Sequence, residues 1–372
     1  MAIFSRHASS NIVIAQFTMN VCLRCGLALV LVTVAAASGL NFRLYGVNYS
    51  PRQGADWDPN RCKTQHQVQE DMLAIATFAD RVRIYSLADC GQGAMVLHEA
   101  KAAGLKVWLG MWVTASNTSI ANELTALQSL VASGLVDKSV VVGLHVGSEN
   151  LYRKDITPDQ AIAYLNQVKT YLASVHLTFF PVTITDVLDT LLQYPQVVAA
   201  VDVVMANEFP FWEAVDISGA IDRFKTKLAA LKSLAGTKPI EIGETGWASA
   251  GQNANASVAS RVNQATYLAS FATYATSTNL PYYWFAAIDE AWKGVQEADD
   301  TTVEAHFGLL DSSNALKAEL VGLSLSGPPT PSPNNNPTTA TPTPQSASGA
   351  AALKPTFVVA VGSIAVAMMS FV

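Results

Sequence analysis

The chain has 372 residues, of which 50% are hydrophobic and 14% are charged, and its formal net charge at pH 7 is −6. A chain of this length can bury a large core, and so apolar a composition excludes a coiled coil or disorder throughout. Because Lys and Arg are scattered and outnumbered by acidic residues, we expect no nucleic-acid partner.

The first predicted element is a secretory signal peptide over residues 1–39. A short segment that carries Arg24 precedes an apolar run at 26–34, and small residues follow at 35–37. This order is typical of a signal peptide with its cleavage site. A transmembrane anchor is the alternative, but the run is short for a bilayer core of about 30 Å.

Between residues 40 and 325, runs rich in Val, Ile, Phe and Tyr alternate with helical patterns. Strands are predicted at 44–49, 81–86, 106–113, 140–147, 178–185, 201–207, 239–247 and 282–288. Helices are predicted at 64–78, 92–103, 119–134, 158–174, 186–194, 218–235 and 257–277. Several strands are apolar on both faces, so the eight units predict an α/β fold of the (β/α)8 TIM-barrel type. A doubly wound sheet is the alternative, but the sequence has no phosphate loop or complete G-x-G-x-x-G motif.

Cysteine positions agree with export. The C-x-x-C pair at 22–25 lies within the predicted signal peptide, which leaves Cys62 and Cys90 for the mature chain. An even pair in an exported protein predicts a disulfide, with two buried free thiols as the alternative. Asn117 and Asn255 begin Asn-x-Ser sequons, and we expect both to carry N-glycans.

Two further segments follow the predicted barrel domain. Residues 326–349 consist mostly of Pro, Thr, Ser and Asn, a composition that predicts an extended disordered stalk. Residues 350–372 form an apolar tail behind small residues, a pattern typical of a GPI-attachment signal with Ser348 as the attachment residue. A membrane-spanning tail is the alternative. We expect a secreted monomer at the cell surface or cell wall, held to the plasma membrane by its lipid anchor alone.

The carboxyl ends of the predicted strands carry mainly acids, amides and aromatic residues. Catalytic groups of a (β/α)8 barrel gather at this end. Aromatic faces that stack on sugar rings, together with two carboxyls, suit cleavage of a glycosidic bond. The side chains at this rim are Asn48, Tyr49, Tyr85, Trp112, Ser148, Glu149, Asn207, Glu208, Glu244, Trp247, Asp289, Glu290, Trp292 and Lys293.

Glu149 and Glu244 form the decisive pair. Each ends a strongly apolar strand, where a carboxylate needs a specific reason because an unpaired buried charge is costly. Glycines flank Glu244 in IEIGETGW, and we expect them to let the backbone approach a ligand. Glu241, earlier on the same strand, is expected to point deeper into the barrel or to be displaced by a bulge. Its role is interpreted as structural.

The motifs VRIYSLADC, VGSENLYR, ANEFPFW, IGETGW, YYWFAAIDEAWK and EAHFGLLD resemble glycoside hydrolase family 17. The resemblance covers residues 44 to about 320, with the motifs in family order. It is stronger to fungal-type cell-wall glucan endo-1,3-β-glucosidases and glucanosyltransferases than to plant endoglucanases. It implies a (β/α)8 barrel, a β-1,3-glucan partner, retention of configuration and no cofactor.

The resemblance also implies residue roles. Glu149 takes the place of the family's acid/base and Glu244 that of its nucleophile. The family's pocket positions correspond to Tyr85, Asn207, Glu290, Lys293 and Glu304, and the rim adds Trp247. Ser148 stands where plant-type members have Asn, which would leave contact with a sugar 2-hydroxyl to a water molecule. No metal is expected, since the six histidines form no H-E-x-x-H motif.

Retention requires two carboxyl groups about 5–5.5 Å apart, and we expect burial or the negative Glu244 to raise the pKa of Glu149. Three functions are compatible with these residues. They are a retaining β-1,3-glucan hydrolase, a glucanosyltransferase with the same catalytic residues, and a non-catalytic glucan-binding surface protein.

Overall fold

The computed structural model describes residues 39–325, and their eight strands form a closed parallel barrel. The predicted TIM barrel is therefore confirmed. Each strand pairs with the next along the chain, and β1 also pairs with β8. The strands are β1 (Val47–Asn48), β2 (Arg81–Arg83), β3 (Lys106–Met111), β4 (Val141–Ser148), β5 (Val182–Val187), β6 (Val204–Asn207), β7 (Ile240–Thr245) and β8 (Tyr282–Trp284).

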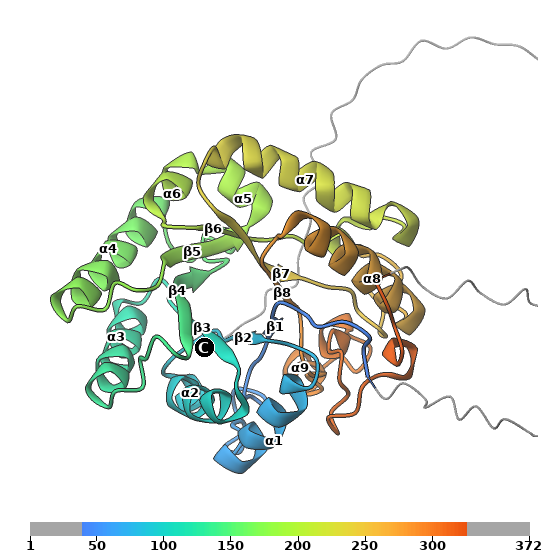
Figure 1. Ribbon diagram of the computed structural model, residues 1–372, viewed down its shortest axis with the longest axis horizontal. Helices are drawn as coiled ribbons and strands as arrows, with labels where there is room; N and C mark the ends of the chain where they lie inside the picture. The colour runs from blue at the N-terminus through green and yellow to red at the C-terminus, as the bar shows by residue number, and fades with distance from the viewer. Residues whose placement is uncertain (1–38, 326–372) are drawn as a thin grey trace, which may run out of the picture. The chain divides into compact units, whose positions relative to one another are not determined.

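Helices surround the barrel on its outside (Figure 1). They are α1 (Gln65–Ala76), α2 (Gln92–Ala103), α3 (Asn117–Ala132), α4 (Pro158–Ser174), α5 (Leu188–Gln193), α6 (Pro195–Ala200), α7 (Ala220–Ala235), α8 (Arg261–Thr278) and α9 (Trp292–Glu297). In the described part of the chain, no helix is long and apolar enough to cross a membrane. Helix α4 follows its predicted bounds because the Thr157 side chain accepts a hydrogen bond from the Gln160 amide and Pro158 occupies the first turn.

The structure corrects several predicted boundaries. Strand β5 begins at Val182 instead of residue 178, because Val182 is its first residue in register with β4. Strand β8 ends at Trp284, four residues before its predicted end. One helix was predicted after β5, but Pro195 begins a second short helix, α6, directly after α5.

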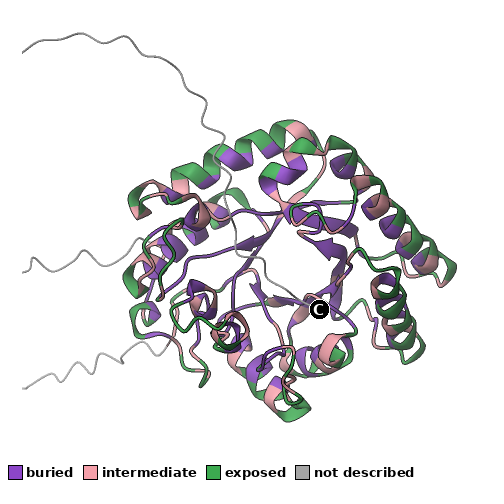
Figure 2. Ribbon diagram, turned by 180° about the vertical axis from the view of Figure 1, so that it is seen from behind, coloured by how far each residue is buried: buried purple, intermediate pink, exposed green. Residues whose placement is uncertain are grey.

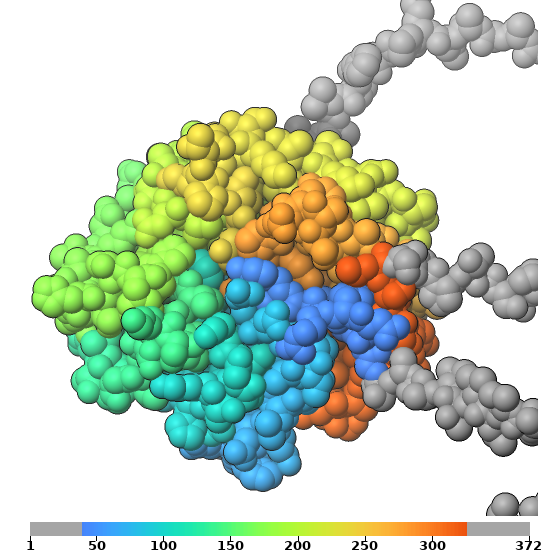
Figure 3. All heavy atoms as spheres, in the orientation of Figure 1, coloured from blue at the N-terminus to red at the C-terminus, as the bar shows by residue number. Residues whose placement is uncertain are grey.

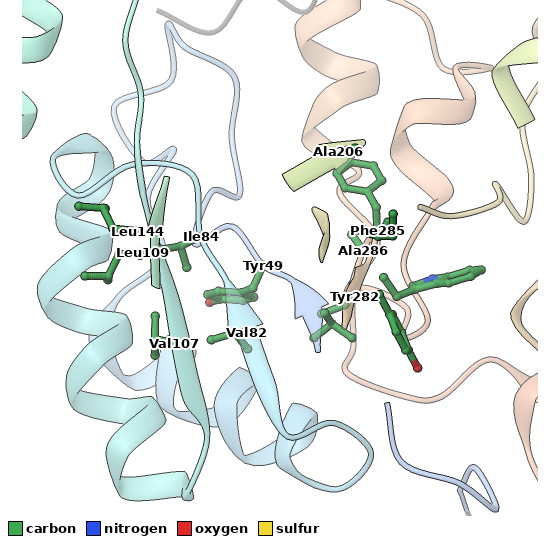
Figure 4. Packing of buried hydrophobic residues seen from close by; sticks show 14 of the residues in the cluster. Tyr49, Val82, Ile84, Val107, Leu109, Leu144, Ala206, Tyr282, Phe285 and Ala286 are labelled. Carbon is green, nitrogen blue, oxygen red and sulfur yellow. The ribbon is translucent and has the colours of Figure 1, made fainter. Parts of the chain in front are cut away.

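Two apolar clusters hold the barrel together. The larger one joins outward-facing strand residues to the inner faces of the helices, so the buried residues in Figure 2 follow the strands and the inner helix faces. Part of this cluster is shown in Figure 4, where Val82 and Ile84 lie near Val107 and Leu109. Trp108 alternates with these residues along β3 and faces the barrel interior, where it belongs to the smaller cluster with Val203, Met205 and Tyr283.

A disulfide and a backbone hydrogen bond join separate segments of the described domain. The predicted disulfide is confirmed, with 2.02 Å between the sulfur atoms of Cys62 and Cys90. The first described residues run beside the last ones, as the blue and red segments of Figure 3 show, and the Asn41 amide donates to the Leu323 carbonyl at 2.9 Å. The predicted stalk and tail lie outside the described residues, as does the predicted signal peptide except for Gly39.

Candidate active site

Glu149 follows the last residue of β4 in a sharply turned backbone. Its φ is +59°, in the left-handed region, and Gly147 before it has a φ of +89°. A Cβ at Gly147 would lie only 2.0 Å from Asn150 Oδ1, so the chain needs glycine at this position. The Asp186 carboxylate holds the next turn by accepting from the amides of Leu151 at 2.9 Å and Tyr152 at 3.2 Å. Glu149 is thus held by the end of β4 and by Asp186 at the end of β5.

Glu149 has an amide partner and a negative neighbour. Asn207 Nδ2 at the end of β6 donates to Glu149 Oε1 at 2.7 Å. Burial is the main reason that the pKa of Glu149 rises to about 7, and the nearby Glu244 carboxylate raises it further. The Asn207 hydrogen bond and, more weakly, Arg153 act in the opposite direction. The expected direction of the pKa shift is therefore found, and Glu149 can hold a proton near neutral pH.

Glu244 lies on β7 and is paired with a cation. Arg83 Nη1 donates to Glu244 Oε1 at 2.9 Å and to Asn48 Oδ1 at 2.8 Å. Glu244 and Arg83 have side-chain exposures of 9% and 0%, so this ion pair is screened little by solvent. Two carboxyls in one site thus have opposite surroundings, since Glu149 accepts from a neutral amide and Glu244 from a guanidinium.

A register shift between β6 and β7 pairs Asn207 with Glu244. Ala206 pairs with Ile242, but Asn207 pairs with Glu244, so Gly243 is skipped in the ladder. A Cβ at Gly243 would lie 2.7 Å from Asn207 Oδ1. At Gly246 a Cβ would lie 2.2 Å from the Phe285 carbonyl oxygen. The expectation that these glycines admit a ligand is corrected, because both make room for neighbouring groups of the protein.

Arg83 is the functional residue that the sequence reasoning missed. Its side chain is fully buried, and it also donates to Ser148 Oγ at 3.1 Å and approaches His145 Nε2 at 3.5 Å. Burial, and then the charge of Arg83, hold the pKa of His145 well below its ordinary value, which leaves its ring neutral. A charged residue between Val82 and Ile84 was the available signal, because period-two alternation turns it into the barrel.

The predicted pocket residues on the β8 side form a charged group. Lys293 Nζ lies 2.8 Å from Glu290 Oε2 and 3.5 Å from Glu304 Oε2. Burial opposes the charge on Lys293, yet the carboxylates of Glu290 and Glu304 raise its pKa overall. Lys293 also lies 4.7 Å from the ring centre of Phe285, which Figure 4 shows beside Ala286. This group places an ammonium held between two carboxyl groups at one wall of the site.

A cleft joins these groups. Two cavities of about 360 Å³ each lie at the barrel mouth and share Ser50, Arg52, Tyr85, Phe285 and Glu290. The second cavity contains Glu149 and Glu244, with Ser148, Trp112, Arg153 and Lys293 in its wall. The Tyr85 hydroxyl is buried and has no hydrogen-bond partner among residues 39–325. An unpartnered hydroxyl beside two carboxyls is suited to a hydroxyl-rich ligand.

Two expected positions differ from the observed ones, and a third, that of Glu241, agrees with the expectation. Trp247 is fully buried, donates from Nε1 to the Val258 carbonyl at 3.1 Å and packs on Phe211, so its expected contact with a sugar is wrong. Glu304 lines neither cavity and lies behind Lys293 instead. Glu241 pairs in register with Met205 of the interior cluster, deeper in the barrel than Glu244.

The remaining predicted sites lie on the surface. Asn117 and Asn255 are both exposed, and Asn117 Oδ1 accepts a hydrogen bond from the Tyr164 hydroxyl at 3.1 Å. Within the described range 39–325, no group of three or more His, Cys, Asp or Glu side chains is placed to hold a metal ion.

Comparison with known proteins identifies the family of the chain. A family model described as the BtgE/BtgC glycoside hydrolase domain matches residues 46–308. A crystal structure of a glycoside hydrolase family 17 β-1,3-glucanosyltransferase from Rhizomucor miehei is 34% identical, with a TM-score of 0.65, over 74% of this chain and 96% of that chain. An active-site mutant of the Rhizomucor miehei β-1,3-glucanosyltransferase, in complex with laminaritriose, matches over 75% of this chain and 97% of that chain at 33% identity and the same TM-score.

Curated relatives come from fungi. A glucan endo-1,3-β-glucosidase of Emericella nidulans is 29% identical over 77% of this chain, and the match covers 46% of that relative. A glucan 1,3-β-glucosidase of Saccharomyces cerevisiae is 28% identical over 70% of this chain and 86% of the relative. The chain therefore spans less than half of the Emericella relative but most of the yeast one.

Fold, site and family model together define the class of the protein as a glycoside hydrolase domain on a (β/α)8 barrel. Within that class, the chain belongs to glycoside hydrolase family 17.

Proposed function

We propose that this protein is a retaining glycosidase that cleaves β-1,3-glucan by double displacement. The observation that carries the proposal is the pair of carboxyls in one cleft. Arg83 is bound to Glu244, whereas among residues 39–325 the side-chain hydrogen bond to Glu149 comes from the Asn207 amide alone. The guanidinium of Arg83 donates a hydrogen bond to Glu244, the carboxyl that we assign as the nucleophile. The raised pKa of Glu149 favours the protonated form, which a general acid needs.

In the proposed first step, a Glu244 carboxylate oxygen attacks the anomeric carbon as the glycosidic carbon–oxygen bond breaks. Glu149 gives its proton to the leaving oxygen. In the second step, Glu149 takes a proton from an incoming hydroxyl, whose oxygen displaces Glu244 from the anomeric carbon. Two inversions at that carbon retain the configuration. The expected carboxyl separation of about 5–5.5 Å belongs to this mechanism and stays a prediction.

The substrate follows from the relatives. The printed names of the Emericella and Saccharomyces relatives specify 1,3-β-linked glucan, and the Rhizomucor complex contains laminaritriose. The wall of the cleft combines Tyr85, Phe285 and Trp112 with carboxyl and amide groups, as a sugar chain requires. We extend this substrate class to the present chain.

Glucanosyl transfer is the second candidate, and the likeness to the Rhizomucor glucanosyltransferase favours it. It uses the same residues in the same first step. The two reactions differ in whether water or a sugar hydroxyl accepts the glycosyl group from Glu244.

Incubation of the protein with laminari-oligosaccharides of one length separates the candidates. Hydrolysis gives shorter products, whereas transfer gives longer products as well. Glu244→Gln should bind the oligosaccharides but abolish turnover, while the control Glu319→Gln, at an exposed glutamate, should behave as wild type. If Glu244→Gln turns over normally, Glu244 is not the nucleophile. If the wild type binds glucan without changing it, the protein is a non-catalytic glucan-binding protein.

We also propose that the protein is exported and acts as a monomer at the cell surface or cell wall. The signal-peptide pattern, the two exposed sequons and the disulfide support export. The small residues around Ser348 and the apolar tail support a GPI anchor. Release of the protein from intact cells by a phospholipase C specific for phosphatidylinositol tests the anchor, and retention after that treatment would contradict it.

A further inference from the structure

The segment between β1 and α1 is a hairpin-like loop over residues 52–62. Arg52 and Cys62 form an isolated antiparallel bridge, and the Gln53 amide donates to the Arg61 carbonyl at 2.7 Å. The disulfide to Cys90 fixes the loop covalently at its second strand. A loop closed in this way loses little further conformational freedom when it binds a ligand.

Contacts on both sides fix the direction of this loop. On the β2 side, Arg61 Nη2 lies 3.3 Å from Asp89 Oδ1. On the β8 side, the Asp56 amide donates to Gln296 Oε1 of α9 at 2.8 Å, and the Arg52 guanidinium lies 4.9 Å from the ring centre of Trp292. The loop is therefore braced against the elements that follow β2 and β8.

The loop also belongs to the wall of the cleft. Arg52 lines both cavities, and Arg61 lines the cavity that contains the two glutamates. Helix α9, on which the loop rests, contributes Lys293 to the same cavity. The base of the loop, at Arg52 and Arg61, thus forms part of the cleft wall on this side.

Trp57 lies at the tip of the loop and is 72% exposed. It makes no ring or cation contact with any residue in the range 39–325, although the tip around it is well ordered by hydrogen bonds. Its chain neighbours Asp56 and Asp58 are partly buried, and their carboxylates accept hydrogen bonds from Arg52 and from the Asn60 amide. An open aromatic face is suited to a sugar ring, which can stack its C–H groups on it.

We infer that Trp57 forms an outlying subsite that binds a glucose unit of a long β-1,3-glucan chain outside the cleft. The inference rests on the proposed function, because it takes its ligand from it. It makes the disulfide-fixed loop a determinant of chain-length preference. Chains long enough to reach Trp57 gain a contact that laminaritriose held in the cleft lacks.

Oxidative footprinting of the whole protein, read by peptide mass spectrometry, tests the contact directly. Long soluble β-1,3-glucan should slow oxidation of Trp57, whereas laminaritriose should not. Phe179 is the internal control, because it is 43% exposed and precedes β5 at the opposite end of the barrel from the cleft. Equal oxidation of Trp57 with and without long glucan would overturn the inference.

Variants give the second test. Trp57→Ala should weaken binding of long glucan by about three- to tenfold, and affinity for laminaritriose should change less. Trp57→Phe should restore most of the loss, and Phe179→Ala should match wild type on both ligands. A Trp57→Ala protein that loses both affinities equally, or neither, contradicts the inference while leaving the proposed function intact.

Two further experimental results would each overturn the inference about Trp57. If the wild type neither binds nor cleaves any β-1,3-glucan, the proposed function fails, and this inference fails with it. If Trp57 becomes protected without glucan as the protein concentration rises, the loop is an interface between two copies of the chain, which overturns the glucan subsite.

Discussion

The ends of β4 and β7 each present one glutamate to the same cleft, yet the two regions are built in opposite ways. At β7, the nucleophile candidate Glu244 is tied to Arg83, which in turn binds Asn48 and Ser148 and so links β1, β2, β4 and β7. At β4, Glu149 has the Asn207 amide and no cation at ion-pair distance among the described residues. The same residue type thus lies in two different electrostatic surroundings.

This difference shows where the specificity of the site comes from. The sequence places a glutamate after each strand, but its chemical role depends on groups contributed by other strands. Arg83 comes from β2 and Asn207 from β6. Closure of the barrel brings each of them to its carboxyl, so the fold itself creates the two different surroundings on which the proposed roles of acid and nucleophile rest.

The largest effect on stability and turnover should follow removal of the Arg83 guanidinium. In Arg83→Met, the buried Glu244 carboxylate loses its partner, which should cost about 3–5 kcal/mol of unfolding free energy and abolish turnover. Denaturant unfolding and product analysis measure the two effects. If stability and turnover both persist, Glu244 does not depend on Arg83.

Two control variants separate charge from packing in this test. Arg81→Met removes a partly exposed arginine of the same strand, which stacks 3.8 Å from the ring centre of Tyr45, and it should cost much less. Arg83→Met combined with Glu244→Gln removes both charges, so it should regain stability but not activity. A double variant as unstable as the single one would indicate that packing of Arg83 dominates.

A smaller effect on activity is expected when Glu149 loses its hydrogen bond from Asn207. Asn207→Ala removes the hydrogen bond to Glu149, which should lower kcat/KM about 10- to 100-fold. Because that hydrogen bond lowers the pKa of Glu149, its loss should move the alkaline limb of the pH–rate profile to higher pH. Asn263→Ala, an amide removed from the surface of α8, is the control. An unchanged alkaline limb would separate Asn207 from the proton donor.

The barrel was predictable because its signal is repeated. Eight apolar runs alternate with helices, and errors at single boundaries, such as the late start of β5 or the missed α6, do not change the topology. Glu149 and Glu244 were predictable for a related reason. A strand end fixes which mouth of the barrel a residue occupies, whatever the exact length of the strand.

Side-chain direction beyond a strand end was not predictable in the same way. Trp247 follows β7 by two residues and turns into the aromatic core beside Phe211 and Tyr267 instead of into the cleft. The pairing that skips Gly243 interrupts the period-two alternation of side chains along β7. A prediction of where Trp247 points depends on that alternation. The period-two alternation of β2 was enough to predict that Arg83 faces the barrel interior. It could not identify Glu244 as the partner of Arg83, because the two residues are 161 positions apart in the chain.

The smallest predicted effect concerns stability and its pH dependence. The folded pKa of Glu149 is about 7, whereas an unfolded glutamate has a pKa of about 4.3. The protonated carboxyl is therefore favoured by folding, and its contribution is complete below about pH 4 and lost as pH rises to 7. Glu149→Gln cannot ionise, so it should be about 1–2 kcal/mol more stable than wild type at pH 8, with no difference at pH 4. The partial exposure of Glu149 to the cleft keeps this estimate below the full pKa difference.

Glu244→Gln supplies the contrast in the same measurement. It leaves the buried Arg83 guanidinium without its carboxylate, so thermal unfolding at pH 8 should show a loss of stability instead of a gain. Other buried carboxyls with raised pKa, such as Glu123 and Glu208, are common to wild type and both variants, so their contributions cancel in the differences. Opposite signs for the two substitutions are what opposite surroundings require. Equal signs would mean that the two carboxyls experience the same electrostatic environment, and the assignment of acid and nucleophile would lose its physical basis.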